Sequence, residues 1–234
     1  MAASRKTTTT EGLTDPGAPM PGREAKSRLL EAAVLLFAEK GYEGVGIREI
    51  AAAAGWNSAL VAYYFRGKEG IHRAALELAC DQVQRLAESF PALPGEAEPD
   101  ARPRAEAALR ETIRTILGSA LPEPGDQEGA LASALIALFL REMAAPVAGT
   151  ETLVLAAVRF HQERMDRCIR IIRPDLDAHA VTRTGMSIYG LMLFFLTYKD
   201  VLPGFGEDGF AGAGLASLID HVTGFALQGL RPAT

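Results

Sequence analysis

Apolar side chains recur at three- and four-residue spacing along most of this chain, which is the periodicity of an amphipathic α-helix. The first such stripe runs from Leu29 to Phe37 and stops at Gly41, a residue type common just beyond a helix end. Proline and glycine residues separate five later helical patterns: 104–120, 129–144, 151–172, 178–199 and 210–230. No stretch alternates apolar and polar residues for long enough to predict a strand. The sequence therefore predicts an all-α fold of about nine helices.

Composition excludes several classes of protein. Of the 234 residues, 48% are hydrophobic and 23% are charged, proportions typical of a soluble globular chain rather than a disordered one. The apolar run 190–197 is shorter than the roughly 20 residues that span a bilayer, and no secretory signal pattern is visible. Two cysteines are too few for a disulfide framework, and the four histidines lack metal-ligand spacing. We expect a cytoplasmic protein with no membrane partner, cofactor or metal site.

The chain has three segments that differ in composition and net charge. Residues 1–22 contain four consecutive threonines, three prolines and three glycines, which predicts a flexible tail. Residues 22–70 carry a net charge of +1, whereas the overall charge of −5 leaves a net −6 on residues 71–234. A slightly basic unit on an acidic body is compatible with a polyanionic partner if its cations are suitably placed. We therefore expect a small N-terminal domain over 23–70 and a larger helical domain over 71–234, and the charge asymmetry by itself is weak evidence for binding to nucleic acid.

Two short helices follow the first long one within the N-terminal segment. One fits 47–54, and a glycine, Gly55, ends it. The next fits 58–64, where Asn57 is a candidate N-cap. Two short helices joined by a tight turn form a helix-turn-helix unit, whose second helix enters the DNA major groove. Leu60, Val61 and Phe65 are expected to face the core, which leaves the small and polar side chains of the second helix outside.

Three runs in this region resemble the N-terminal domain of the TetR family of bacterial transcription factors. They are RLLEAAVLLFAEKGYE (28–43), IREIAAAAG (47–55) and VAYYFRGKEG (61–70). The run LREMAAP (140–146) resembles, more weakly, a stretch in the ligand-binding domain of the CerR-type branch of that family. The resemblance implies a sequence-specific transcriptional regulator, usually a repressor, that a small-molecule inducer releases from an inverted-repeat operator.

The resemblance also implies which residues would meet duplex DNA. Base or phosphate contacts would come from Arg48, Asn57, Ser58, Ala59, Tyr63, Tyr64 and Lys68. Glycine at 46 replaces the common Ser or Thr cap, and alanine at 62 replaces a frequent tyrosine, so each position lacks one usual DNA contact. Position 64 usually holds His, and the Tyr64 phenol retains a hydrogen-bond donor there. Two alternatives stay open, namely an ion pair for Arg48 and a packing role for Trp56.

The C-terminal helices would serve dimerisation and ligand binding. A lone helix-turn-helix unit reads only a few base pairs, so specific binding generally needs two copies. In the resembling family the last two helices form the dimer interface, which implies Ile188, Leu191, Met192, Phe195, Leu215, Leu218, Ile219, Val222 and Phe225. These stripes could also be purely intramolecular core. An inducer pocket in the central helices would be lined by Leu135, Leu138, Phe139, Met143, Phe160, His161 and Met165, with Arg141 or Arg164 as further polar contacts.

Two other functions compete with this interpretation. The run 204–209 spells GxGxxG, the dinucleotide-binding fingerprint, but it follows a helical pattern and a proline where that motif needs a strand. No recognisable motif places a base beside a nucleophile, so we expect no enzyme. The second alternative is a helical dimer that binds a ligand or acts as a scaffold without binding DNA.

Overall fold

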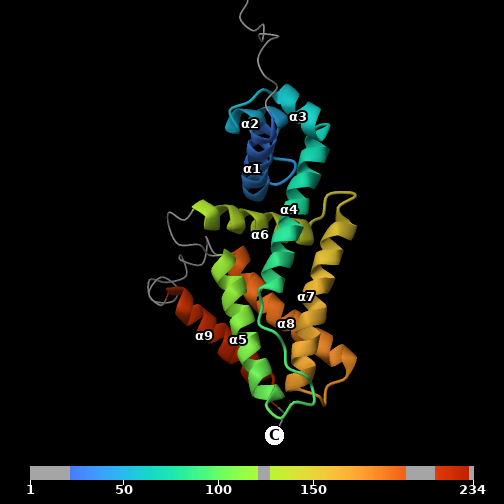
Figure 1. Ribbon diagram of the computed structural model, residues 1–234, viewed down its shortest axis with the longest axis vertical. Helices are drawn as coiled ribbons and strands as arrows, with labels where there is room; N and C mark the ends of the chain where they lie inside the picture. The colour runs from blue at the N-terminus through green and yellow to red at the C-terminus, as the bar shows by residue number, and fades with distance from the viewer. Residues whose placement is uncertain (1–21, 121–126, 199–213, 232–234) are drawn as a thin grey trace, which may run out of the picture.

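A computed structural model describes residues 22–120, 127–198 and 214–231, and within these ranges the chain forms nine α-helices and no strand (Figure 1). The helices are α1 (Arg23–Lys40), α2 (Ile47–Ala53), α3 (Ser58–Phe65), α4 (Lys68–Glu88), α5 (Ala101–Ala120), α6 (Gln127–Ala144), α7 (Glu151–Ile172), α8 (Ala178–Thr197) and α9 (Gly214–Gly229). The all-α prediction is confirmed. The fifth helix begins three residues earlier than predicted, because Pro103 fits its first turn, where no intrahelical N–H bond is lost.

The N-terminal core lies at the junction of α1 with α2, α3 and α4. Leu29, Phe37, Ile50 and Val61 are fully buried in it, and each comes from an apolar stripe on its own helix. The core continues along α4 as far as Val83. The helix that follows the helix-turn-helix unit is therefore part of the same packed body for most of its length.

A second core is formed by α5, α7, α8 and α9 at the opposite end of the molecule, below α6 in Figure 1. Its fully buried members include Leu117, Ile169, Ile172 and Met192. Both cysteines are buried free thiols, one in each core, and burial raises the pKa of Cys80 to about 11. Neither thiol is therefore ionised near neutral pH.

The sixth helix joins the two cores. It crosses α4 beneath α1, nearly perpendicular to the long axis of the molecule (Figure 1). Leu135, Leu138 and Phe139 contribute to the N-terminal core, whereas Ile136 faces the C-terminal one. Since α4 and α6 pack against both bodies, a movement at one core has two direct structural connections to the other.

Some sequence-based expectations fall outside the described residues, namely the 1–21 part of the predicted tail and the glycine-rich run 204–209. Among the described helices, α8 is long and apolar enough to cross a bilayer by length and composition alone. A core helix of a soluble protein passes the same test, and Ile188 and Met192 of α8 are indeed core residues.

Candidate DNA-binding surface and central cavity

The turn between α2 and α3 is a compact unit held by its own backbone. Gly55 has a φ of +74°, a left-handed conformation that glycine adopts without a steric penalty. The Trp56 amide donates to the Ala51 carbonyl at 2.8 Å, which folds the chain back against α2. The Trp56 ring is half-buried against the N-terminal core, which accords with a packing role.

Asn57 is the N-cap of α3, as its position in the sequence predicts. Its side-chain Oδ1 accepts a hydrogen bond from the Ala59 amide at 2.9 Å. This bond satisfies one of the amide groups that have no partner within the helix. At the other end, Arg66 has a φ of +62° and closes the helix in the left-handed region. Both ends of α3 are therefore defined by local interactions.

The two faces of α3 have opposite character. Val61 and Phe65 are buried in the N-terminal core, whereas Ala59, Ala62 and Tyr63 are exposed. The Tyr63 side chain is 63% exposed, although its ring is largely apolar. The exposed face thus combines small side chains with one aromatic hydroxyl, and Ser58 lies half-buried at its start. A helix with such a face can approach a nucleic acid groove closely.

The remaining candidate contact residues surround α3. Tyr64 is half-buried, packs its ring edge-on against Tyr63 with 4.9 Å between ring centroids, and has its hydroxyl 3.5 Å from the Gly22 carbonyl. Lys68 is the first residue of α4, and its Nζ lies 4.3 Å from the centroid of the Tyr42 ring. A lysine at this place adds a full positive charge to the positive end of a helix dipole.

Arg48 is exposed on α2, and its neighbour Glu49 pairs instead with Lys40 of α1 at 2.6 Å. Within the part of the chain that the structure describes, Arg48 forms no ion pair. Its guanidinium therefore keeps its charge available at the surface. The Lys40–Glu49 pair connects the end of α1 to α2, and the bond to Lys40 lowers the pKa of Glu49.

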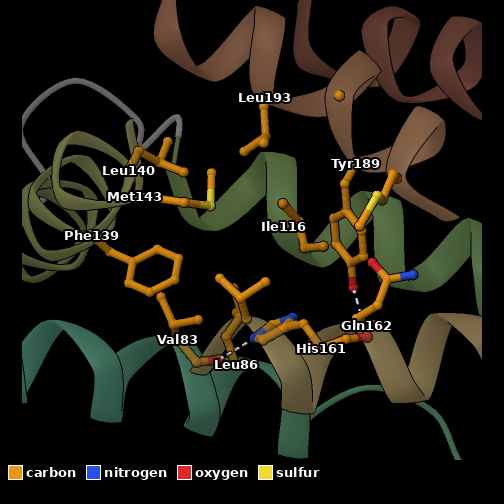
Figure 2. A pocket seen from close by; sticks show the side chains of 13 residues that line it. Val83, Leu86, Ile116, Phe139, Leu140, Met143, His161, Gln162, Tyr189 and Leu193 are labelled. Carbon is orange, nitrogen blue, oxygen red and sulfur yellow. Dashed lines mark hydrogen bonds between the residues drawn. The ribbon is translucent and has the colours of Figure 1, made fainter. Parts of the chain in front are cut away.

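A cavity of about 250 Å³ lies where α4, α5, α6, α7 and α8 converge (Figure 2). Its wall is mainly aliphatic and aromatic, and its polar side chains are His161, Gln162 and Tyr189. The lining residues are Val83, Leu86, Ile116, Phe139, Leu140, Met143, Val158, His161, Gln162, Met186, Tyr189, Gly190 and Leu193. Apolar walls with a few polar groups are typical of small-molecule sites.

Three of the seven residues predicted for a pocket line this cavity: Phe139, Met143 and His161. Leu135 and Leu138 face the N-terminal core, and Met165 is buried in the C-terminal core. Phe160 is 41% exposed at the surface of α7. The lining residues that the prediction missed come largely from α4 and α8, because their contribution depends on how those helices cross α6 and α7.

The two arginines suggested as polar contacts have other partners. Arg164 donates to the Pro91 carbonyl and lies 5.4 Å from the centroid of the Phe90 ring. The Arg141 guanidinium donates to the Glu39 carbonyl at 3.1 Å, near the end of α1. Neither side chain lines the cavity. Arg141 instead fastens α6 to the N-terminal body.

The residues predicted for a dimer interface divide into two sets. Ile188, Met192, Ile219 and Val222 are buried within the single chain. Four others are half-buried and Phe225 is 64% exposed, so part of each of these side chains is accessible to a second copy: Leu191, Phe195, Leu215, Leu218 and Phe225. Additional exposed apolar side chains on or next to α8 are Met186, Phe194 and Tyr198.

A buried polar cluster between α4 and α6 was not predicted from the sequence. His72 Nε2 lies 3.1 Å from Glu142 Oε1, and both side chains are almost completely buried. The other carboxylate oxygen, Oε2, accepts bonds from the Thr150 hydroxyl at 2.9 Å and from the Val147 amide at 3.0 Å. Burial lowers the pKa of His72, and the nearby carboxylate acts in the opposite direction. A single histidine in an apolar stripe was the only sequence signal.

The fold and this surface together define a helix-turn-helix protein in which the recognition helix sits at one end of an all-helical body. Residues 29–75 match the family described as bacterial regulatory proteins, tetR family. The N-terminal domain of this chain is therefore similar to the DNA-binding domain of TetR-family regulators.

Relatives with curated names agree with that assignment. The chain is 35% identical over 105 residues to the HTH-type transcriptional dual regulator CecR of Shigella flexneri, covering 43% of this chain and 44% of CecR. It is 40% identical over 60 residues to the HTH-type transcriptional regulatory protein RaaS of Mycobacterium tuberculosis, covering 26% of this chain and 28% of RaaS. The matched part of the chain thus spans less than half of each of these relatives.

Solved structures extend the likeness to the whole fold. AibR, in its complex with isovaleryl coenzyme A and operator DNA, superposes with a TM-score of 0.62 at 19% sequence identity. The superposition covers 87% of this chain and 97% of AibR. At this level of identity the comparison shows a shared fold, including the C-terminal helices that the family match does not reach.

Proposed function

We propose that this protein is a transcriptional regulator that binds duplex operator DNA as a homodimer and releases it when a small molecule enters the central cavity. Repression is the mode of action that the family favours, and the cytoplasm is the expected location. The observation that carries the proposal is the exposed face of α3, where Tyr63 points into solvent beside the small residues Ala59 and Ala62.

The arrangement of cations supports binding to a polyanion. Arg48 on α2 and Lys68 at the start of α4 lie in the elements that flank α3 in the chain. Phosphate contacts from such flanking elements position a recognition helix, whose own residues then read base edges. The acidic body would oppose nonspecific binding, so that affinity depends on these few placed charges.

A homodimer is supported by the apolar side chains that α8 and α9 leave in solvent. A shallow groove between these helices is bordered by Leu191 and Phe225, and both belong to the stripes predicted for an interface. Apolar patches of this kind mark interaction sites in soluble proteins. Two copies joined through α8 and α9 would present two recognition helices to successive major grooves.

Regulation is supported by one turn of α6. Leu140 and Met143 line the cavity, while Arg141 reaches α1 and Glu142 reaches α4. A molecule that moves this turn would displace α1 and α4, the two helices that flank the helix-turn-helix unit in the chain. The solved complex of AibR with both isovaleryl coenzyme A and operator DNA supports the combination of ligand and DNA binding on this fold.

The test is a mobility-shift titration of the full-length protein on DNA from upstream of its own gene, at several salt concentrations. Lys68→Ala should weaken binding and reduce the salt slope by about one per protomer, because one phosphate contact is lost. The matched control is Arg102→Ala on α5, at the opposite end of the molecule, where the arginine pairs with Glu106 in the next turn. Absence of binding at every salt concentration would favour the alternative of a scaffold that does not bind DNA, and equal effects of both variants would show that Lys68 makes no phosphate contact.

A further inference from the structure

The wall of the central cavity carries no full charge. Among the described residues that line it, none is Lys, Arg, Asp or Glu. Burial lowers the pKa of His161, so its imidazole is neutral at pH 7. A buried anion or cation without a partner of opposite charge is strongly disfavoured. The cavity therefore selects against ligands whose charged group would have to enter it.

The hydrogen-bond donors of the wall are largely committed to the protein itself. The His161 Nε2–H group donates to the Val83 carbonyl at 2.9 Å, which leaves Nδ1 as the unprotonated nitrogen. The Tyr189 hydroxyl donates to the His161 carbonyl at 3.2 Å. One amide hydrogen of Gln162 is used by Asp166 at 2.6 Å. Figure 2 shows His161, Gln162 and Tyr189 together on one side of the cavity.

The hydrogen-bonding positions that remain free on His161, Gln162 and Tyr189 are mainly acceptors. An imidazole Nδ1, a phenol oxygen lone pair and an amide carbonyl all accept hydrogen bonds. A carboxylate offers only acceptors and would find one spare amide N–H at most. A hydroxyl or N–H group on a ligand would find several partners. The polar side of the cavity is therefore complementary to a hydrogen-bond donor on the ligand.

The size of the cavity limits the hydrocarbon part of the ligand. An engineered apolar cavity of roughly 150 Å³ takes up benzene. At about 250 Å³, this cavity has room for a body somewhat larger than one aromatic ring. The side chains of Phe139, Met143 and Leu193 line the cavity and provide apolar contacts around such a body.

From these observations we infer that the cavity binds a small, uncharged, mainly apolar molecule whose single polar group donates a hydrogen bond. This ligand class rests on the proposed function, which makes the cavity the inducer site. It differs from the isovaleryl coenzyme A of the AibR complex, since no cation lines this cavity to receive a phosphate or carboxylate.

Three probes with one hydrocarbon body test the inference: 2-naphthol, 2-methoxynaphthalene and 2-naphthoate. Binding to the full-length protein at pH 7.5 is measured by calorimetry. We expect 2-naphthol to bind at least about tenfold more tightly than 2-naphthoate, which would bring an unpaired charge into the cavity. The methyl ether, which lacks the donor, should bind more weakly than 2-naphthol. Equal or tighter binding of 2-naphthoate, or no binding of 2-naphthol, overturns the inference.

The position of the site is tested by two substitutions of Gly190 on α8. A Cβ built at this lining residue has no neighbouring atom within 4 Å, so larger side chains start in open space. Gly190→Trp should block the cavity and abolish 2-naphthol binding, while Gly190→Ala should retain it. Retained binding in the Trp variant would place the probe elsewhere and contradict the inference. DNA binding of the parent protein is measured separately, so a wrong ligand class is distinguished from a failure of the proposed function.

Discussion

His72 on α4 and Glu142 on α6 approach to 3.1 Å at a point where both side chains are buried. The imidazole also lies edge-on to Phe37 and Tyr42, each with 4.8 Å between ring centroids. A carboxylate in such surroundings is stable only because its oxygens have partners. This cluster therefore fixes the position of α4, which follows directly on the helix-turn-helix unit, relative to α6, which lines the cavity.

Removal of that carboxylate should be costly. Glu142→Ala leaves the Thr150 hydroxyl and the Val147 amide without their acceptor and His72 without its charged neighbour. We expect the free energy of unfolding to fall by about 1 to 3 kcal/mol for each buried donor left without an acceptor, measured by urea denaturation. Glu142→Gln is the matched control, because an amide oxygen still accepts both bonds, and it should lose less. Equal, small losses in both variants would show that the cluster contributes little to stability.

Two histidines, the buried His72 and the half-buried His161, predict a dependence of stability on pH. Burial lowers the pKa of both His72 and His161 below the ordinary 6.5. The unfolded chain therefore takes up protons first as the pH falls, and the free energy of unfolding should decrease below about pH 6.5. Each imidazole contributes a slope of at most about 1.4 kcal/mol per pH unit.

Urea denaturation at several pH values between 7.5 and 5.5 checks this slope. His161→Gln should reduce it, since an amide can donate to Val83 in place of the imidazole but does not titrate. His179→Gln, at an exposed position of α8, keeps His72 and His161 and should therefore keep the parent slope. A slope that neither substitution changes would assign the pH dependence to other groups.

Asn57 has a structural role that bears on DNA recognition. Its Oδ1 caps α3 through the Ala59 amide, so this oxygen is occupied when the helix is formed. Asn57→Ala should lower the free energy of unfolding by about 0.5 to 2 kcal/mol, and DNA affinity should fall with it. Asn57→Ser keeps a cap and should preserve stability. If the Ser variant is stable yet loses DNA affinity, the Asn57 amide itself contacts DNA.

The helices and the exposed face of α3 could be predicted because their signals are local. The stripe from Leu29 to Phe37, the N-cap at Asn57 and the glycine at 55 each specify structure within a few residues. The sequence does not indicate which neighbouring helix each inward-facing residue of α6 contacts. Leu138 and Phe139 are adjacent in sequence and both belong to the N-terminal core, but only Phe139 reaches the cavity wall, a difference set by where α6 crosses its neighbours.

The pairing of His72 with Glu142 could not be predicted for a related reason. The two lie far apart in the sequence, and helical periodicity indicates which side of a helix is buried but not what it is buried against. The same limit applied to the last two helices. The sequence predicts their apolar stripes, yet whether Met192 or Phe225 faces a second copy depends on how α8 and α9 pack within one chain.

Phe225 should be important for dimerisation. It is 64% exposed and borders the groove between α8 and α9. Phe225→Asp should shift sedimentation velocity profiles from dimer to monomer while helical content is retained, because a charge would be buried in an apolar interface. Leu155→Asp on α7, at another exposed apolar position, is the control and should leave the dimer intact. A dimer that survives Phe225→Asp would place the interface on another face.

Arg141 should couple the cavity to the DNA-binding end. It donates to the Glu39 carbonyl of α1, directly beside the cavity residues Leu140 and Met143, but does not itself line the cavity. Arg141→Met removes this connection and leaves the cavity wall unchanged. Without ligand the variant should bind DNA about as tightly as the parent, and with saturating 2-naphthol it should release DNA less.

The coupling is the ratio of DNA affinities with and without ligand, which is about 5- to 150-fold in typical allosteric proteins. We expect Arg141→Met to reduce this ratio several-fold while calorimetry gives an unchanged affinity for 2-naphthol in the absence of DNA. Arg114→Met on α5, where the arginine pairs with Glu111 in the same helix, is the control and should keep the parent ratio. If Arg141→Met instead weakens DNA binding equally with and without ligand, Arg141 positions α1 but does not transmit the ligand signal.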